Sequence, residues 1–218
     1  MQKYGLKCPI RKANPYRRMA KALKTNAVAP NLVNRKFKSY GPRQVLLTDI
    51  TYIRLKDAFC YLSVIIDAYT MQVLAFKLSE SLEVDFVLQT VLQLMKNHLY
   101  SFNATTIIHS DQGCHYTSVK FRELIQNSNL RQSMSRRGNC WDNAPQESFF
   151  GHMKDELAPY KKAWKTFNDV KERITDWMNY YNNDRYQMQL HGMAPNEYYQ
   201  YKVTNKLPSA LAANTAKK

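Results

Sequence analysis

An acid interrupts an apolar run in the stretch Val45-Leu46-Leu47-Thr48-Asp49-Ile50-Thr51-Tyr52-Ile53. The β-branched and apolar side chains around it predict a buried strand over residues 44–54. A carboxylate inside a buried strand is costly unless a cation or several hydrogen-bond donors hold it. Asp49 is therefore expected to have a chemical role and not only a structural one.

Two further acids stand in comparable places. Asp111 ends the run Ile107-Ile108-His109-Ser110-Asp111, and Glu147 enters a predicted helix after Pro145. Three carboxylates brought together would repel one another and raise one another's pKa values. A divalent cation removes that repulsion, because hard cations take oxygen ligands. The sequence therefore predicts a Mg²⁺ or Mn²⁺ site formed by Asp49, Asp111 and Glu147.

The rest of the pattern predicts an α/β protein with a mixed sheet. Strands are expected at residues 44–54, 59–67, 71–78, 105–109 and 131–134, and helices at 83–100, 117–127, 144–157, 167–182 and 195–201. Asp49 is expected on the central strand. Asp111 is expected at the end of the neighbouring strand, where open α/β sheets place their sites. Glu147 would come from a helix packed beside them.

Basic residues gather near the N-terminus. The 218-residue chain has a formal net charge of +15, and residues 1–43 contain 12 Lys and Arg without one Asp or Glu. The remaining residues nearly balance, with 20 basic and 17 acidic side chains. A one-sided cluster of this kind is typical of polyanion binding, so we expect an irregular DNA-binding arm with one short helix near 17–24. The alternative is a solvated arm that only maintains solubility.

Composition argues against several other classes. The sequence contains no run of about 18 apolar residues, so no membrane-spanning helix is expected. The N-terminus lacks the apolar stretch of a signal peptide. The four cysteines show neither CxxC nor zinc-finger spacing, so a structural zinc site is not expected. Four scattered thiols are typical of a reducing compartment, which predicts a cytoplasmic protein. His109 and His115 flank Asp111, and we expect both to be hydrogen-bonded structure rather than metal ligands.

The predicted helix over residues 144–157 has two distinct faces. At about 100° per residue, one face gathers Phe149, Phe150, Met153 and Leu157, which should pack on the sheet. An adjacent face carries Glu147, Gly151 and Lys154. Lys154 is therefore expected to meet a DNA phosphate, and Gly151 to let a DNA backbone come close.

The segment before this helix is a basic loop. Arg136 and Arg137, followed by Gly138, are expected to contact phosphates. Trp141 is expected to anchor the loop by packing rather than to stack on a base. Asn143 is expected to cap the helix.

These blocks resemble the catalytic core of the DDE transposases and retroviral-type integrases, which has an RNase H-like fold. Between Asp111 and Glu147 lie 35 residues, the interval known for this family. The block Ser133-Met134-Ser135-Arg136-Arg137-Gly138-Asn139-Cys140-Trp141-Asp142-Asn143-Ala144-Pro145 resembles the OrfB-type transposases of the IS-three group of bacterial insertion sequences. The resemblance covers about residues 1–200.

The resemblance implies an RNase H-like mixed five-stranded sheet flanked by helices. The domains would be a basic arm at 1–43, a catalytic core at 44–160, a helical C-terminal extension at 161–204 and a disordered tail at 205–218. In the arm, the DNA contacts would include Arg11, Lys12, Arg17 and Arg18.

The implied activity is metal-dependent cleavage and transfer of DNA strands. Asp49 would bridge two Mg²⁺ or Mn²⁺ ions about 3.5–4 Å apart, with Asp111 and Glu147 each holding one. The implied partners are insertion-sequence ends and target DNA, further copies of the chain on that DNA, and an upstream first-frame helix-turn-helix protein. The implied location is a bacterial nucleoid, away from membranes.

Two features depart from the family pattern. The opening Met1-Gln2-Lys3-Tyr4-Gly5-Leu6 resembles the end of a helix-turn-helix region, so the element that recognises transposon ends is expected to be missing. Near the C-terminus Tyr181, Asn182 and Arg185 fit the pattern, but its histidine position holds Gln187. The rival functions are a truncated DNA-binding regulator that inhibits transposition and a nuclease that cuts without joining.

Overall fold

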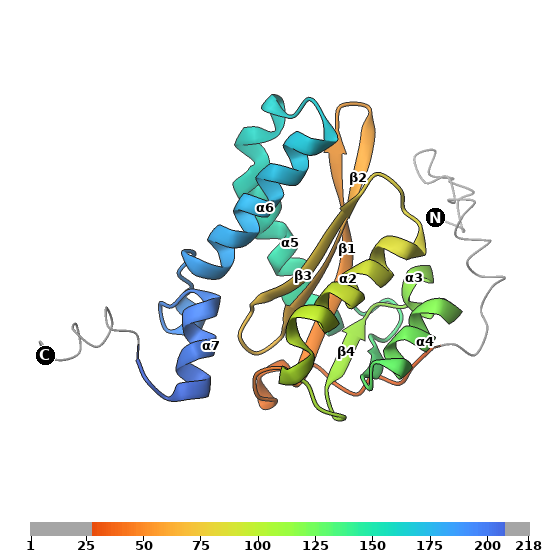
Figure 1. Ribbon diagram of the computed structural model, residues 1–218, viewed down its shortest axis with the longest axis vertical. Coiled ribbons are helices and arrows are strands. Elements are labelled where there is room, and N and C mark those ends of the chain that lie inside the picture. Colours follow the sequence, from red (N-terminus) through yellow and green to blue (C-terminus); the bar gives the residue numbers. More distant parts are fainter. Residues whose placement is uncertain (1–27, 208–218) are drawn as a thin grey trace, which may run out of the picture.

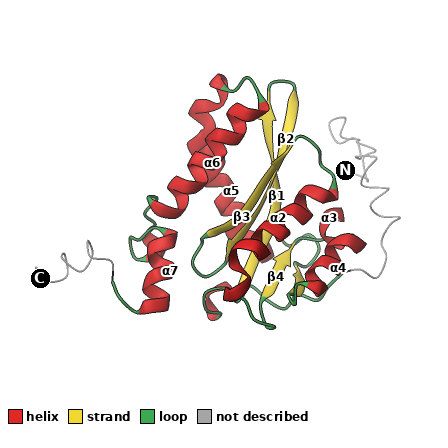
Figure 2. Cartoon of the chain, in the orientation of Figure 1, coloured by secondary structure: helices red, strands yellow, loops and turns green. Residues whose placement is uncertain are grey.

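A computed structural model describes residues 28–207 and arranges them as one mixed sheet with helices on both faces (Figures 1 and 2). The arm residues Arg11, Lys12, Arg17 and Arg18 and the short helix expected at 17–24 lie outside the described residues, as does the tail from residue 208. None of the helices within 28–207 has the length and apolarity that a bilayer crossing requires.

The sheet has five strands in the order β3-β2-β1-β4-β5, as predicted for a mixed α/β sheet. Their bounds are β1 (Val45–Leu55), β2 (Ala58–Asp67), β3 (Val73–Ser79), β4 (Ile107–Ser110) and β5 (Arg131–Met134). The first three strands are antiparallel neighbours, whereas β4 runs parallel to β1 and β5 runs parallel to β4. The predicted strand positions are therefore confirmed, with shifts of one or two residues at most ends.

Strand β1 is paired unequally on its two sides. It pairs with β2 from Leu46 to Leu55, but with β4 only over Val45, Leu46 and Leu47. Beyond Leu47, the edge of β1 on the β4 side therefore has no strand partner among the described residues. Asp49 lies on this unpaired part of the central strand, and Asp111 directly follows the last residue of β4.

The helices cover both faces of the sheet. Helices α2 (Val84–His98), α3 (Cys114–Thr117) and α4 (Val119–Asn127) lie on one face, and α5 (Ala144–Leu157) and α6 (Phe167–Asn183) on the other (Figure 1). The last helix, α7 (Pro195–Thr204), packs against α6. The helix expected at 117–127 corresponds to α4, which begins at Val119 because Ser118 is extended and caps it by accepting a hydrogen bond from the backbone of Phe121. The short helix α3 before it was not predicted.

The apolar run in β1 is buried on both faces, which explains why it is nearly continuous. Val45, Leu47 and Ile53 belong to the core beneath α5 and α6, and Leu46 to the core beneath α2 and α4. The predicted packing face of α5 is confirmed, since all four of its members are buried: Phe149, Phe150, Met153 and Leu157.

The segment before β1 packs against the core. Val33 is buried in the core beneath α5 and α6. Arg43 is also buried: its backbone N–H and its guanidinium donate to Asp67 Oδ2 at 2.7 and 3.0 Å. Asp67 Oδ1 accepts from the backbone of Tyr69 and Thr70, so this acid holds the turn after β2 together.

Candidate active site

The three predicted acids come from three different elements around the open edge of β1. Asp49 lies on β1, Asp111 follows β4, and Glu147 lies in the first turn of α5. The pKa of Asp49 is raised to about 7, chiefly by burial and then by repulsion from Asp111, with a further contribution from Glu147. The negative charges of the three acids therefore act on one another.

Protein donors hold the two aspartates. Asp49 Oδ1 accepts the backbone N–H of Ile50 at 2.8 Å, and Asp111 Oδ1 accepts the backbone N–H of Gly113 at 2.8 Å. A Cβ at position 113 would lie 2.9 Å from Asp111 Oδ1, so a larger residue would displace the carboxylate. Gly113 thus preserves the position of the Asp111 carboxylate.

Asn143 holds Asp49 from the other side of the site. It occupies the N-cap position of α5, but its side chain makes no capping hydrogen bond, so the predicted capping role is wrong. Instead its Nδ2 donates to Asp49 Oδ2 at 3.0 Å. Asn143 is 5% exposed, and its Oδ1 has no partner in the described structure. This residue is part of the site and was not identified as such from the sequence.

Asp142 ties three segments together beside the site. Its side chain is fully buried and accepts hydrogen bonds at 2.7–3.0 Å from the side chains of Asn31, Arg35 and Arg136 and from the backbone N–H of Arg136. The Arg136 guanidinium is the main cause that holds the pKa of Asp142 well below its usual value. Asp142 therefore connects the N-terminal segment and the basic loop to the turn that precedes α5.

The basic residues predicted to meet DNA differ in their surroundings. Arg136 is paired with Asp142, a role the sequence did not indicate, although its side chain remains 54% exposed. Arg137 is exposed. Lys154 is half-buried, and its pKa is lowered by burial and then by Lys161, while Asp49 raises it. Lys154 thus lies within electrostatic reach of the acids.

Gly151 is on the solvent side of α5. A Cβ there would meet no atom within 4 Å, so the packing of the described chain does not require a glycine. The ring of Trp141 is 68% exposed, which makes the predicted packing role wrong.

Both histidines near Asp111 are structural, as expected. His109 is buried, with Nδ1 2.9 Å from Ser133 Oγ and Nε2 donating to the backbone oxygen of Asp142 at 3.0 Å. His115 Nε2 donates to the backbone oxygen of Leu82 at 2.8 Å.

The acids suit a divalent cation by their chemistry. They offer only carboxylate oxygens, and the pKa of Asp49 is raised by burial and then by repulsion from the other two acids, both of which a hard cation would offset. Among the side chains of residues 28–207, no three His, Cys, Asp or Glu groups stand close enough to chelate an ion as they are. The case for a metal therefore rests on donor type and charge, not on a preformed cage.

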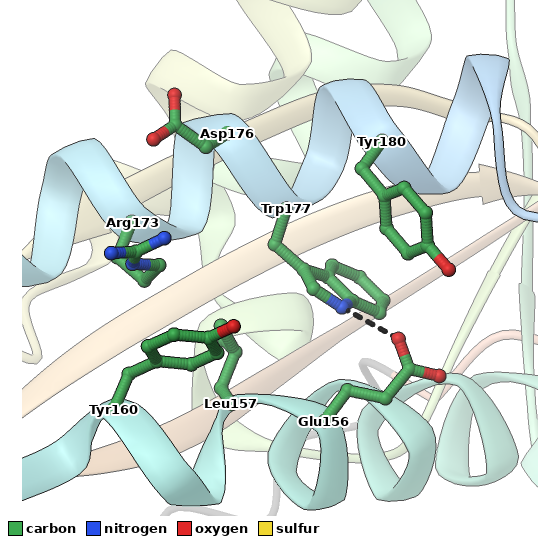
Figure 3. A pocket seen from close by; sticks show the side chains of 7 residues that line it. All are labelled: Glu156, Leu157, Tyr160, Arg173, Asp176, Trp177 and Tyr180. Carbon is green, nitrogen blue, oxygen red and sulfur yellow. Dashed lines mark hydrogen bonds between the residues drawn. The ribbon is translucent and has the colours of Figure 1, made fainter.

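The residues of the C-terminal pattern have structural partners. Asn182 bonds both the backbone N–H and the backbone oxygen of Val73 on β3. Glu156 accepts from Arg185 at 2.8 Å and from the indole of Trp177 at 2.9 Å. Figure 3 shows the Trp177 contact in a pocket of about 430 Å³ between α5 and α6. These groups fasten α6 to the sheet and to α5.

Two family models, each described as an integrase core domain, match residues 39–140 and 147–202. An uncharacterized transposase-like protein of Haemophilus influenzae is 33% identical over 201 residues, covering 91% of this chain and 88% of that protein. The putative transposase InsK for insertion sequence element IS150 of Escherichia coli is 34% identical over 170 residues. That match covers 78% of this chain but 59% of InsK, so the chain spans little more than half of this relative.

Solved structures share the fold. The HTLV-2 integrase catalytic core domain in complex with magnesium has a TM-score of 0.58 at 16% identity, covering 73% of this chain and 97% of that domain. A chain of the simian T-cell lymphotropic virus intasome has a TM-score of 0.65 at 16% identity, covering 78% of this chain and 58% of that one. The RNase H-like architecture expected from the sequence is thereby confirmed.

Proposed function

Because the chain belongs to the integrase-core family of insertion-sequence transposases, we propose that it catalyses metal-dependent cleavage and transfer of DNA strands. The observation that supports this most is the placement of Asp49 on the open edge of β1, with Asp111 directly after β4 and Glu147 in the first turn of α5, close enough that both acids raise the pKa of buried Asp49. All three acids are present, which favours an enzyme over a truncated regulator.

Asp49, Asp111 and Glu147 would hold Mg²⁺ or Mn²⁺, in this proposal two ions. When bound, such ions activate an oxygen nucleophile and relieve charge on the departing oxygen. The chain itself supplies the positioning: Asn143 and the Ile50 N–H orient Asp49, and the Gly113 N–H orients Asp111. With water as nucleophile the reaction is hydrolysis, and with a DNA 3′-hydroxyl it is strand transfer.

DNA would approach along the unpaired edge of β1 and the exposed face of α5. Lys154 and Arg137 would contact phosphates there, and Gly151 would admit the backbone closely, because no side chain intervenes. Arg136 would contribute its exposed part while bound to Asp142. The arm residues Arg11, Lys12, Arg17 and Arg18 would add sequence-independent contacts to phosphates.

The partners proposed are insertion-sequence ends, target DNA and further copies of this chain on the DNA. The similarity to an intasome chain supports assembly on DNA, and the similarity to a magnesium-bound core supports the choice of metal. An upstream first-frame helix-turn-helix protein is proposed to supply recognition of the element's ends.

A joining assay tests the function. A duplex with a pre-cut 3′ end is incubated with plasmid and Mg²⁺, and joined product is measured for the wild type and for Asp49→Asn, Asp111→Asn and Glu147→Gln. Wild-type joining that disappears in all three variants supports a transposase. Cutting without joining indicates a nuclease, and binding alone indicates a regulator. Asp155→Asn is the matched control, because Asp155 is an exposed acid on the same helix.

A further inference from the structure

A small pocket of about 200 Å³ lies between elements that also carry two of the three acids, Asp49 and Glu147. The β1–β2 hairpin forms one wall, and the end of α5 with the turn after it forms the other, two regions that lie side by side in Figure 1. Tyr52 lies three residues beyond Asp49 on β1, and Lys154 two turns beyond Glu147 on α5. The pocket is therefore built on the two elements that carry Asp49 and Glu147.

The hairpin wall carries exposed aromatic surface. Tyr52 is 50% exposed and Phe59 is 49% exposed, and their rings meet edge to face with centroids 6.4 Å apart. Tyr61 supports the ring of Tyr52 from behind, at 5.2 Å. About half of the surface of these two aromatic residues faces water, and a flat aromatic ligand stacked against them would bury it.

The opposite wall is cationic. Lys154 and Lys161 line this wall, and Arg54 adds a third cation from the hairpin wall. None of the lining residues, which lie within 52–164, is acidic. Lys161 is close enough to Lys154 to lower the pKa of Lys154, so the two ammonium groups repel each other. An anion between them would remove that repulsion.

We propose that this pocket binds one unpaired nucleotide of the DNA strand that reaches the catalytic acids. The base lies against Tyr52 and Phe59, and the phosphate lies beside Lys154 and Lys161. The inference rests on the proposed function and extends it to a substrate with a frayed, single-stranded end. The pocket, which is large enough for one base, would hold that end open next to Asp49.

The test compares two probes that differ only in their bases. One is a fluorescent duplex of arbitrary sequence with a short 3′ single-stranded overhang, and the other has an abasic overhang with the same phosphates. Anisotropy titrations with the full chain should give an affinity about tenfold higher for the overhang with bases, equivalent to about 1.4 kcal/mol, within the range of one stacked base.

Variants separate the stacking wall from the charged wall. Phe59→Ala should abolish most of the preference for bases, whereas Tyr100→Ala, which removes a fully exposed aromatic ring outside the pocket, should keep it. Lys161→Ala should weaken binding of both probes equally, and Lys162→Ala, its exposed neighbour outside the pocket, should change neither.

Equal affinity of the wild type for both probes would contradict the proposed nucleotide-binding pocket. A preference for the overhang with bases that remains in both Phe59→Ala and Tyr52→Ala would contradict it as well. Neither result would affect the proposed function, because strand joining is measured separately on a pre-cut end. Conversely, a chain that prefers bases but never joins strands would keep the pocket and overturn the transposase activity.

Discussion

Asn143 Nδ2 donates a hydrogen bond of 3.0 Å to Asp49 Oδ2, and this bond joins the turn before α5 to the central strand. Glu147 lies one helical turn after Asn143. The start of α5 therefore carries Glu147 and also holds Asp49 through Asn143. The neighbouring Asp142 fixes that turn through its contacts with Arg35 and Arg136. The geometry of the acids therefore depends on two polar residues that are not themselves proposed metal ligands.

Asn143→Ala should raise the pKa of Asp49 further. The amide stabilises the ionised carboxylate, and its loss leaves burial and the neighbouring acids unopposed on that side. A hydrogen bond to a charged group contributes about 1.5 kcal/mol or more, which corresponds to an increase of about one pKa unit. Carboxyl NMR titration of the metal-free chain measures it, with Asn179→Ala as the control. An unchanged Asp49 pKa would show that the bond is not formed in solution.

Asp49→Asn should stabilise the metal-free chain at high pH. The pKa of Asp49 is about 7 in the folded chain, against 3.8 as the ordinary value. Ionisation of Asp49 therefore costs the folded state stability as the pH rises from about 4 to 7, by at most about 4 kcal/mol. The variant should exceed the wild type in unfolding free energy at pH 8 and match it near pH 3.5. Urea unfolding in EDTA measures both, and a variant less stable at pH 8 would contradict the raised pKa of Asp49.

Gly151→Ala should stabilise the folded chain but reduce its strand-joining activity. An alanine Cβ meets nothing within 4 Å, and alanine is favoured over glycine in a helix by about 1 kcal/mol. Thermal unfolding should therefore rise by a few degrees, while strand joining falls because the methyl group keeps the DNA backbone away. Ser148→Ala, on the same helix, serves as the control. Full joining activity in the stabilised Gly151→Ala protein would mean that DNA does not approach this face.

Asp142→Ala should destabilise the chain by about 2 kcal/mol, less than the loss of a fully buried ion pair, because Arg35 and Arg136 remain partly exposed. The folded-state pKa of Asp142 is depressed, so its stabilisation is complete above the unfolded pKa near 3.8 and is lost progressively as the pH falls from there through the lower folded-state pKa. The difference in unfolding free energy should thus shrink between pH 6 and pH 2. A difference that stays constant over this range would mean that charge is not its origin.

The strands, the main helices and the three acids were predictable because their signals are local. Apolar periodicity marks β1 and α5, and an acid inside or directly after a strand is conspicuous in sequence. The roles of Asp142 and Asn143 were not predictable, since their partners are remote: Arg35 is 107 residues from Asp142, and Asp49 is 94 residues from Asn143. The one available signal was that Asp142 is the sole acid beside the Arg136–Arg137 pair.

Charge counting also has a limit in this chain. Arg35 and Arg43 belong to the acid-free stretch at the N-terminus, yet each pairs with an acid far along the sequence. Net charge gives the excess of basic side chains but does not show which of them already form ion pairs within the protein. The DNA-binding arm therefore remains a prediction for the residues before this packed segment.

Direct measurement of cation binding tests whether Asp49, Asp111 and Glu147 form one site. Mn²⁺ is titrated into the chain, and free Mn²⁺ is followed by electron paramagnetic resonance. Saturable uptake by the wild type is expected, with uptake lost in Asp49→Asn, weakened in Asp111→Asn and Glu147→Gln, and retained in Asp155→Asn. Uptake by Asp49→Asn equal to that of the wild type would contradict the assignment of these carboxylates as a metal site.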